Sequence, residues 1–321
     1  MAKNIEKYNE ILNLILNTSQ YDIVKHKIMS EFYCKNDFSE KAEKSKWVND
    51  IKKEQKPNGS WGRFHSQDSS AKQKYPTTEN AVLLLKYLAI GRGNNIIESA
   101  CNYMEKLLSD LSLWPDAWEK NKWFKLAVPL FIASKLTMFG SNHPDFMEVC
   151  KIWVKILKSS FASNKYNGKE TDFIALENIG VQIDGSYIGL NSINSILLFS
   201  YNTNLIPVEI QMKYIKWLHY NPNNICYTAT SLNKNLNELS GNKLYDYLRI
   251  MMLLSKFNGY ADEFSHEIKW LENQCGKDGY WDFGNKINSN LKLSDNWRLE
   301  MNRKIDNTIF VLSAFFSSVK N

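Results

Sequence analysis

The sequence predicts an all-helical fold in a single domain over residues 1–321, an α/α toroid of six outer and six inner helices. Three observations lead to this prediction. Helical segments alternate between a single apolar stripe and apolar character on nearly every face, their connections alternate between short and long, and one helix-loop-helix unit occurs twice. A helix with one stripe lies on an outer surface, whereas a helix that is apolar all round is covered on several sides.

The two sets of helices follow each other along the chain. The outer set begins near residues 3, 43, 96, 145, 207 and 262, and the inner set begins near residues 20, 77, 125, 189, 242 and 303. The turn at 17–19 separates the first pair, and Pro207 suits the first position of its helix. Connections from inner to outer helices are short: 91–95, 140–144, 202–206 and 258–261.

The connections from outer to inner helices are long and must all lie on one face. They span residues 56–76, 111–124, 163–188, 220–240 and 275–302, and the stretch 163–188 is expected to be irregular. Loops of this length are usually functional or disordered, and these loops carry several tryptophans, which favours function. The N-termini of the inner helices meet the same face and favour anions. We therefore expect a central pit with an apolar wall and a mildly positive mouth.

The repeated unit consists of Gln, Gly and Trp between an outer and an inner helix. QKPNGSW supplies Gln55, Gly59 and Trp61, and QCGKDGYW supplies the second set with one residue inserted, Gln274, Gly279 and Trp281. Ring packing and a side-chain amide bonded to backbone groups explain the unit as a structural staple, which is the favoured interpretation.

With this unit and the alternating helices, the chain resembles the terpenoid cyclase and protein prenyltransferase superfamily, specifically small proteins with prenyltransferase/squalene-oxidase repeats. The resemblance implies a toroid with a small amphipathic substrate, such as an isoprenoid, in its pit. Toroids of this kind also host sugar-processing enzymes and binding domains. The chain departs from the family in its chemistry, because it has no DxDD or DDxxD sequence, no Asp-x-Cys zinc pair and no adjacent Cys-His.

Composition limits the classes of function. The chain is 44% hydrophobic and 13% aromatic, enough for a large core, and has no apolar run that would predict a membrane span or a secretory signal. We expect a cytoplasmic protein. Five scattered cysteines without CxxC spacing predict neither a disulfide framework nor a zinc site, and we expect no metal and no cofactor. The net charge of +6 is dispersed, which argues against nucleic acid as a partner. The oligomeric state is left open.

The first candidate catalytic segment is GRFHSQD, directly after Trp61. It offers Arg63, His65 and Asp68 on the long-loop face. A histidine near a carboxylate can act as a general acid or base, and an arginine can hold an anionic oxygen pair. The alternative is a solvated loop in which Asp68 caps a turn.

The second candidate is WPDAWE, which places Asp116 and Glu119 among tryptophans that include Trp114. An acid desolvated by indole rings has a raised pKa and could deliver a proton, as a cyclase without DxDD would require. The favoured alternative is that both acids cap the following helix.

A third candidate is Asp184 with Tyr187, in the longest loop. Gly180 and Gly185 would allow this loop to fold over the pit. We therefore include Asp184 among the candidate catalytic groups and Tyr187 among the substrate contacts.

Arginine is scarce in this lysine-rich chain, yet Arg63, Arg298 and Arg303 occur beside the two Gln-Gly-Trp units. We expect their guanidinium groups to converge on one sector of the mouth, with Trp297 beside them, and to select a phosphate or carboxylate. The apolar part of the substrate would then face three tryptophans, Trp61, Trp114 and Trp281. Alternatively, Arg298 and Arg303 bind the carboxylates of Asp295 and Asp306.

These patterns lead to three hypotheses for function. The first is an enzyme for a small amphipathic substrate, with acid-initiated cyclisation or prenyl transfer as its chemistry. The second is a non-catalytic ligand-binding or protein-interaction toroid. The third is a carbohydrate-active hydrolase or lyase, for which aromatic platforms and two carboxylates suffice.

Overall fold

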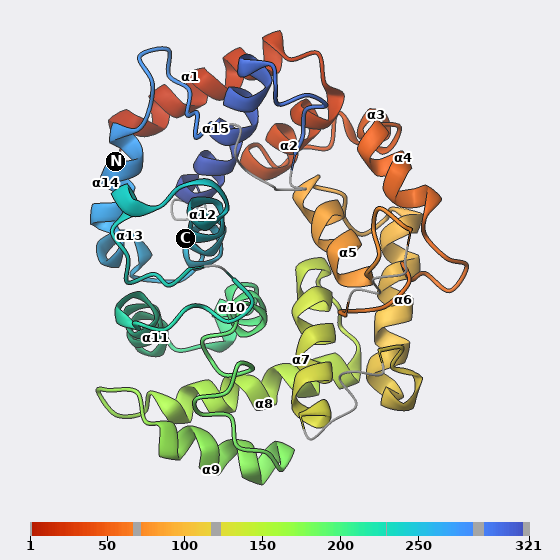
Figure 1. Ribbon diagram of the computed structural model, residues 1–321, viewed down its shortest axis with the longest axis vertical. Coiled ribbons are helices and arrows are strands. Elements are labelled where there is room, and N and C mark those ends of the chain that lie inside the picture. The colour runs from red at the N-terminus through yellow and green to blue at the C-terminus, as the bar shows by residue number, and fades with distance from the viewer. Residues whose placement is uncertain (1, 67–71, 117–122, 229, 285–291, 317–321) are drawn as a thin grey trace.

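The computed structural model describes residues 2–66, 72–116, 123–228, 230–284 and 292–316 (Figure 1). Within these ranges every regular element is a helix, and β-pairing is limited to two isolated bridges, Arg63 with Thr77 and Ser192 with Cys226. The prediction of an all-α chain is therefore confirmed. Both bridges tie a long loop to residues at the start of an inner helix.

The helices form two sets that alternate along the chain, one towards the centre of the picture and one towards its edge (Figure 1). The inner set is α2 (Asp22–Phe32), α5 (Thr78–Tyr87), α7 (Phe124–Leu136), α10 (Ile193–Ser200), α12 (Gly241–Leu254) and α15 (Glu300–Phe316). The outer set is α1 (Ala2–Thr18), α4 (Lys46–Lys53), α6 (Asn95–Ser109), α8 (Pro144–Ser160), α11 (Val208–Tyr220), α13 (Tyr260–Glu263) and α14 (Ser265–Asn273).

Two further α-helices and several short 3-10 turns lie in the connections. The helices are α3 (Ser39–Glu43) and α9 (Gly168–Ile179), and the 3-10 turns are η1 (Leu111–Leu113), η3 (Thr137–Phe139), η4 (Thr203–Leu205) and η5 (Leu236–Glu238). The expectation that 163–188 is irregular was wrong. Asn167 caps α9 by accepting the backbone N–H of Glu170, Gly180 ends it with a φ of 81°, and α9 packs on α8.

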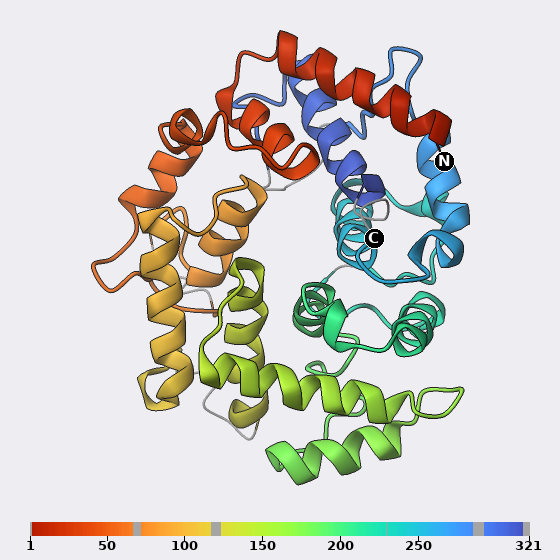
Figure 2. The same ribbon diagram turned by 180° about the vertical axis from the view of Figure 1, so that it is seen from behind.

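The last helix contacts the first inner helix, as the view from behind also shows (Figure 2). Ser313 Oγ on α15 donates to Glu31 Oε2 on α2 at 3.0 Å, and Asn302 Nδ2 donates to the Tyr21 hydroxyl at 3.1 Å. His26 Nε2 on α2 donates to the carbonyl of Ala89, just after α5, at 3.1 Å. Helix α2 therefore contacts both the C-terminal helix α15 and the residues just after α5.

The tryptophans of the two Gln-Gly-Trp units form the same hydrogen bonds. In each, the indole N–H donates at 2.7 Å to a carbonyl 10 residues earlier, that of Ile51 for Trp61 and of Leu271 for Trp281. Each tryptophan backbone N–H also donates at 3.1 Å to a threonine hydroxyl of the following inner helix. Both rings are fully buried. In the first unit, Gln55 Nε2 also donates to the carbonyls of Gly59 at 3.1 Å and Ile96 at 2.9 Å. The unit is thus a joint between an outer and an inner helix.

The interior is not uniformly apolar, in contrast to the wall that we expected. Several inner helices carry charged side chains that are nearly or fully buried, namely Lys27, Lys135 and Asp306. Buried charges are costly unless they are paired, so each marks a place where specific partners are needed.

Among the described residues no single helix is long and apolar enough to cross a bilayer. Taken together, the helical segments Phe124–Phe139 and Pro144–Ser160 have the length and composition of a membrane span, but the chain bends by 108° between them.

Candidate functional site

The loop that carries His65 is held by a buried carboxylate from the next long loop. Asp116 is fully buried, and its Oδ1 accepts the backbone N–H of Phe64 at 2.9 Å. Its Oδ2 accepts the backbone N–H groups of His65 at 2.7 Å and Ser66 at 2.9 Å. The ring of Trp114 packs on Phe64 with centroids 4.8 Å apart. Asp116 and Trp114 therefore position the loop that carries His65.

The side chain of His65 contacts the first turn of α5. Its Nδ1 donates to Glu79 Oε2 at 2.5 Å, because a carboxylate oxygen can only accept there. The other oxygen, Glu79 Oε1, lies 2.7 Å from Nζ of Lys135 on α7. His65 and Glu79 retain 19% and 13% of their side-chain exposure, whereas Lys135 retains 2%. Glu79 therefore bridges the buried ammonium of Lys135 and the partly exposed imidazole of His65.

Lys135 is surrounded by polar groups from two further inner helices. Its Nζ donates to Asn194 Oδ1, in the first turn of α10, at 2.6 Å and to Ser134 Oγ at 2.9 Å. Nδ2 of Asn194 is buried and has no hydrogen-bond partner within the described part of the chain. Arg249 on α12 adds a second positive charge near Lys135. The cluster thus draws on α5, α7, α10 and α12.

The electrostatics keep Glu79 ionised. Burial by itself would raise its pKa, but the Lys135 ammonium and the His65 hydrogen bond outweigh burial and lower the pKa of Glu79 to about 2. Burial lowers the pKa of Lys135, while the Glu79 carboxylate acts in the opposite direction. A fixed negative charge beside Nδ1 orients the imidazole, and a general acid or base needs to be held in this way.

Aromatic rings flank His65 on two sides. Phe131 of α7 stacks on the imidazole at 4.3 Å, and Tyr227 meets it edge-on at 5.3 Å. Tyr227 has a φ of 67°, unusual for a residue with a side chain, and is 43% exposed. Its ring lies 6.1 Å from that of Tyr187, which in turn lies 6.1 Å from Trp123. The predicted residues His65 and Tyr187 are therefore linked through Tyr227, which sequence reasoning did not identify.

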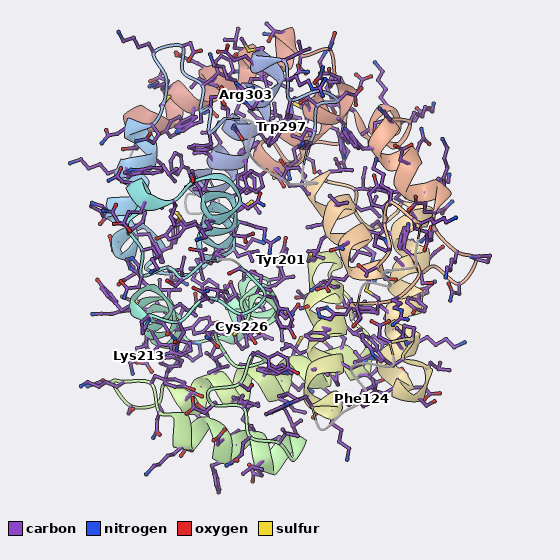
Figure 3. The ribbon with its side chains drawn as sticks, in the orientation of Figure 1. Phe124, Tyr201, Lys213, Cys226, Trp297 and Arg303 are labelled. Carbon is purple, nitrogen blue, oxygen red and sulfur yellow. The ribbon has the colours of Figure 1, made fainter. Side chains whose placement is uncertain are left out.

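A groove of about 660 Å³ begins beside these rings, lined by the loop around Asp184 and the end of α11. Tyr187 and Cys226 line it, and Cys226 is labelled in Figure 3. Asp184 is exposed and accepts a hydrogen bond from the Tyr166 hydroxyl at 2.6 Å. The Tyr166 ring stacks on Trp217 at 4.5 Å. The groove is therefore aromatic, with one carboxylate on its wall.

Arg303, one of the three arginines predicted to bind an anion, is paired with a carboxylate of the protein. Arg303 binds Asp282 through two hydrogen bonds, Nε to Oδ1 and Nη2 to Oδ2, both 2.7 Å, and Nη1 donates to the carbonyl of Trp297 at 3.0 Å. Figure 3 shows Arg303 and Trp297 near the start of α15. The indole of Trp297 is buried and donates to Asp306 Oδ2 at 2.5 Å. These groups form a local clamp around the start of α15.

Of the remaining predicted residues, two lie at the surface or near it and two lie outside the described ranges. Arg298 is exposed, and its backbone N–H donates to Asn296. Arg63 is half-buried, and its carbonyl accepts the backbone N–H of Thr78 at 2.8 Å. Asp68 and Glu119, both predicted as site residues, lie outside the described residues.

Sequence reasoning missed Glu79, Lys135 and Asn194, although one signal was present. Lys135 is the single charged residue within the otherwise apolar run LAVPLFIASKLTMF, and a lone charge in such a helix requires a partner. Glu79 looked like an ordinary first-turn acid, because it follows the N-cap Thr77.

No family model, curated protein or solved structure matches this chain. Within the described residues, no group of three or more His, Cys, Asp or Glu side chains could hold a metal ion. The site must therefore be interpreted from its own geometry.

Proposed function

We propose that the fold is a single α/α toroid of the kind found in terpenoid cyclases and prenyltransferases. Contacts between successive inner helices support this proposal, since α5 packs on α7, α7 on α10, α10 on α12, α12 on α15 and α15 on α2. The bond from His26 to Ala89 continues this series from α2 to the end of α5. The two identical tryptophan joints add the repeat expected of stacked helix pairs.

We propose further that the protein is an enzyme in which His65 is the general acid or base and Glu79 positions it. The observation that carries this proposal is the 2.5 Å contact between His65 Nδ1 and a carboxylate whose charge is held by Lys135. A base that is oriented by a third group is the common feature of enzymes that activate a nucleophile or protonate a leaving group. An interaction module without chemistry does not require this arrangement.

The substrate in this proposal is small and amphipathic, with its polar end at His65 and its apolar part on Tyr187 and Tyr227. Because Glu79 is ionised, the cluster lacks a protonated carboxyl group that could transfer its proton to an alkene. Of the two reactions that the resemblance suggests, transfer of a prenyl group therefore fits the cluster better than acid-initiated cyclisation.

The test is turnover of farnesyl diphosphate with small thiol, amine and alcohol acceptors, analysed by mass spectrometry. Replacing His65 with Asn should lower the rate by roughly 10² to 10⁴-fold, the usual contribution of a general acid or base. Replacing His266, which is 86% exposed, with Asn is the matched control and should leave the rate unchanged. Saturable binding without turnover by the wild type would instead favour a binding toroid.

The groove supports a second candidate, a carbohydrate-active enzyme. Its wall offers the stacked pair Tyr166 and Trp217, the exposed ring of Tyr220 and the carboxylate of Asp184, with several asparagines on its rim. Aromatic faces and amides are the groups that bind sugar rings. The test is release of reducing ends from a panel of oligosaccharides. Activity that is lost in Asp184→Asn and retained in Asp262→Asn would support this candidate.

A further inference from the structure

The groove lined by Asp184 carries charge of one sign, although the protein as a whole is basic. Among the described residues that line it, Asp184 is the one charged side chain, and the others are aromatic, amide, small or apolar. The whole chain, by contrast, has a net charge of +6. The groove is therefore a local acidic site, and it should favour a cationic ligand over an anionic one.

The carboxylate of Asp184 is held at the start of α9. Its Oδ1 accepts the Tyr166 hydroxyl at 2.6 Å, and the backbone N–H of Asp184 donates to Asp172 Oδ1 at 2.8 Å. Its Oδ2 packs on Gly168, the first residue of α9, where a Cβ atom would lie 2.1 Å from this oxygen. A helix start attracts a carboxylate, and the Tyr166 hydroxyl fixes its direction. The side chain is nevertheless exposed, so its charge is accessible from the groove.

Two tyrosines present exposed rings in the same groove. Tyr220, the last residue of α11, is 61% exposed, and Tyr187 is 46% exposed. Trp217, three residues before Tyr220, stacks on Tyr166 with centroids 4.5 Å apart. Exposed aromatic rings bind the apolar faces of a ring-shaped ligand, and they also attract ammonium groups. The rings and Asp184 thus favour the same kind of ligand, a cation with some apolar surface.

Asparagine side chains supply much of the remaining polar lining, from Asn191, Asn221, Asn223 and Asn224. Each amide offers two donors and an acceptor. One acceptor is used within the loop, because Asn221 Oδ1 accepts the backbone N–H of Asn223 at 3.0 Å. Hydroxyl groups suit such a surface because they can donate and accept, whereas a purely apolar ligand would desolvate the amides and Asp184 without replacing their partners. The groove therefore fits a cation that carries several hydroxyl groups.

We propose that the groove binds an amino sugar, with the ammonium group on Asp184 and a sugar ring against Tyr220. The ammonium donates to the carboxylate, and the hydroxyl groups bind the asparagines. This assignment rests on the carbohydrate candidate proposed above and adds the charge of the sugar. A neutral or acidic sugar lacks the contact with Asp184 and binds more weakly.

The test is calorimetric titration of the full chain with oligosaccharides of equal length and linkage, built from glucosamine, N-acetylglucosamine or glucose. At mildly acidic pH, where the sugar amines are protonated, the glucosamine chain should bind about fivefold more tightly than the other two. This is the size that an exposed ion pair with a ring contact allows. General electrostatics of a protein with a net charge of +6 act in the opposite direction, so such a preference reports the groove itself.

The outcomes of this titration separate the charge preference from enzymatic activity. Equal affinity for the three oligosaccharides would overturn the amino-sugar site and leave the carbohydrate candidate in place. A preference for the glucosamine chain without release of reducing ends would support the site and contradict the enzyme. Oligolysine bound as tightly as the glucosamine chain would show recognition of positive charge alone and overturn the site, and binding of none of the three oligosaccharides would overturn both.

Variants at Asp184 and its neighbour test the ion pair. Asp184→Asn should lower the affinity for the glucosamine chain about two- to fivefold and leave that for the glucose chain unchanged. Gly168→Ala keeps the charge but displaces the carboxylate, so it should act in the same direction. Glu209→Gln removes an exposed carboxylate of α11 that does not line the groove, and it should bind as the wild type does. An equal loss in Asp184→Asn and Glu209→Gln would overturn the role of Asp184.

The exposed ring of Tyr220 has a matched control on α9. Tyr220→Leu should weaken binding of all three oligosaccharides about two- to fivefold, because the ring contact is lost. Phe173→Leu removes a ring that is 62% exposed and lies outside the groove lining, and it should leave binding unchanged. Circular dichroism of each variant checks that the fold is retained. Wild-type affinity in Tyr220→Leu would overturn the placement of the sugar ring.

Discussion

Nζ of Lys135 lies 2.7 Å from Oε1 of Glu79, and the two side chains retain 2% and 13% of their exposure. Residues 79 and 135 belong to different inner helices, α5 and α7, so this contact joins two neighbouring walls of the interior. In a medium of low dielectric the pair is strongly coupled, and removal of one partner leaves an uncompensated charge. Its contribution to stability and its role beside His65 can be separated by mutation.

Lys135→Met should lower the free energy of unfolding by about 3–5 kcal/mol, because Glu79 is left charged and partly buried. The double variant Glu79→Gln with Lys135→Met should recover much of this loss, since both charges are then gone. Urea denaturation measures both. Lys155→Met, which breaks an exposed pair with Glu177, should cost no more than about 1 kcal/mol. A loss in Lys135→Met no larger than that of the control would contradict the role of the buried pair.

Gly59 in the first tryptophan joint should not tolerate a side chain. Its φ is 90°, and a Cβ atom there would lie 2.1 Å from the backbone oxygen of Ser99. Gly59→Ala should therefore cost roughly 2–5 kcal/mol, the backbone strain together with the clash. Gly140→Ala is the matched control, because its φ is 63° but the space around it is open, and it should cost about 1–2 kcal/mol. Equal melting temperatures for the two variants would argue against the joint.

Much of the helical order could be predicted from sequence because the signals were local. Thr77 caps α5 and Asn94 caps α6 through side-chain hydrogen bonds, and Gly140 and Gly180 end helical segments with positive φ. The helix α9 was missed although Asn167 and Gly180 carried both of its end signals. The length of the connection, by contrast, indicated a loop.

The candidate site could be predicted only in part, because its contacts join distant segments. His65 and Asp116 were chosen separately as catalytic groups, yet the structure uses Asp116 to hold the backbone at His65, 51 residues away. The carboxylate that contacts the imidazole is Glu79, whose position in a first turn gave no sign of a second partner. Burial of Lys135 was predictable from its apolar neighbours, but the identity of its partner was not.

Asp116→Ala should disturb the loop at 64–66 as well as global stability. Three backbone N–H groups lose a charged acceptor, and each such bond contributes about 1.5–3 kcal/mol, so we expect a loss of about 3 kcal/mol or more. Hydrogen exchange of the amides of Phe64, His65 and Ser66 should become faster than in the wild type. Asp295→Ala, at an exposed side chain, should change stability by no more than about 0.5 kcal/mol. Unchanged exchange at these amides would contradict the clamp.

His219 on α11 contacts glutamates of α13 and α14, and we expect these contacts to make the free energy of unfolding depend on pH. Its Nδ1 lies 2.8 Å from Glu263 Oε1 and its Nε2 lies 3.2 Å from Glu267 Oε1. Burial lowers its pKa, but the hydrogen bonds and charges of Glu267 and Glu263 outweigh burial, and the pKa of His219 is raised above 6.5. A raised pKa means that the folded state binds the proton more tightly than the unfolded state.

The stabilisation by His219 is therefore complete below about pH 6.5, the value for an unfolded histidine, and is lost as pH rises through the higher folded value. The wild type should lose free energy of unfolding between pH 6 and pH 9 relative to His219→Gln, which cannot titrate. Urea denaturation of both proteins at several pH values measures the difference. His266→Gln, at an exposed side chain, should follow the wild type. If the wild type gained stability relative to His219→Gln as pH rose, His219 would be neutral in the folded protein, and the two glutamates would bind it only as a hydrogen-bond donor.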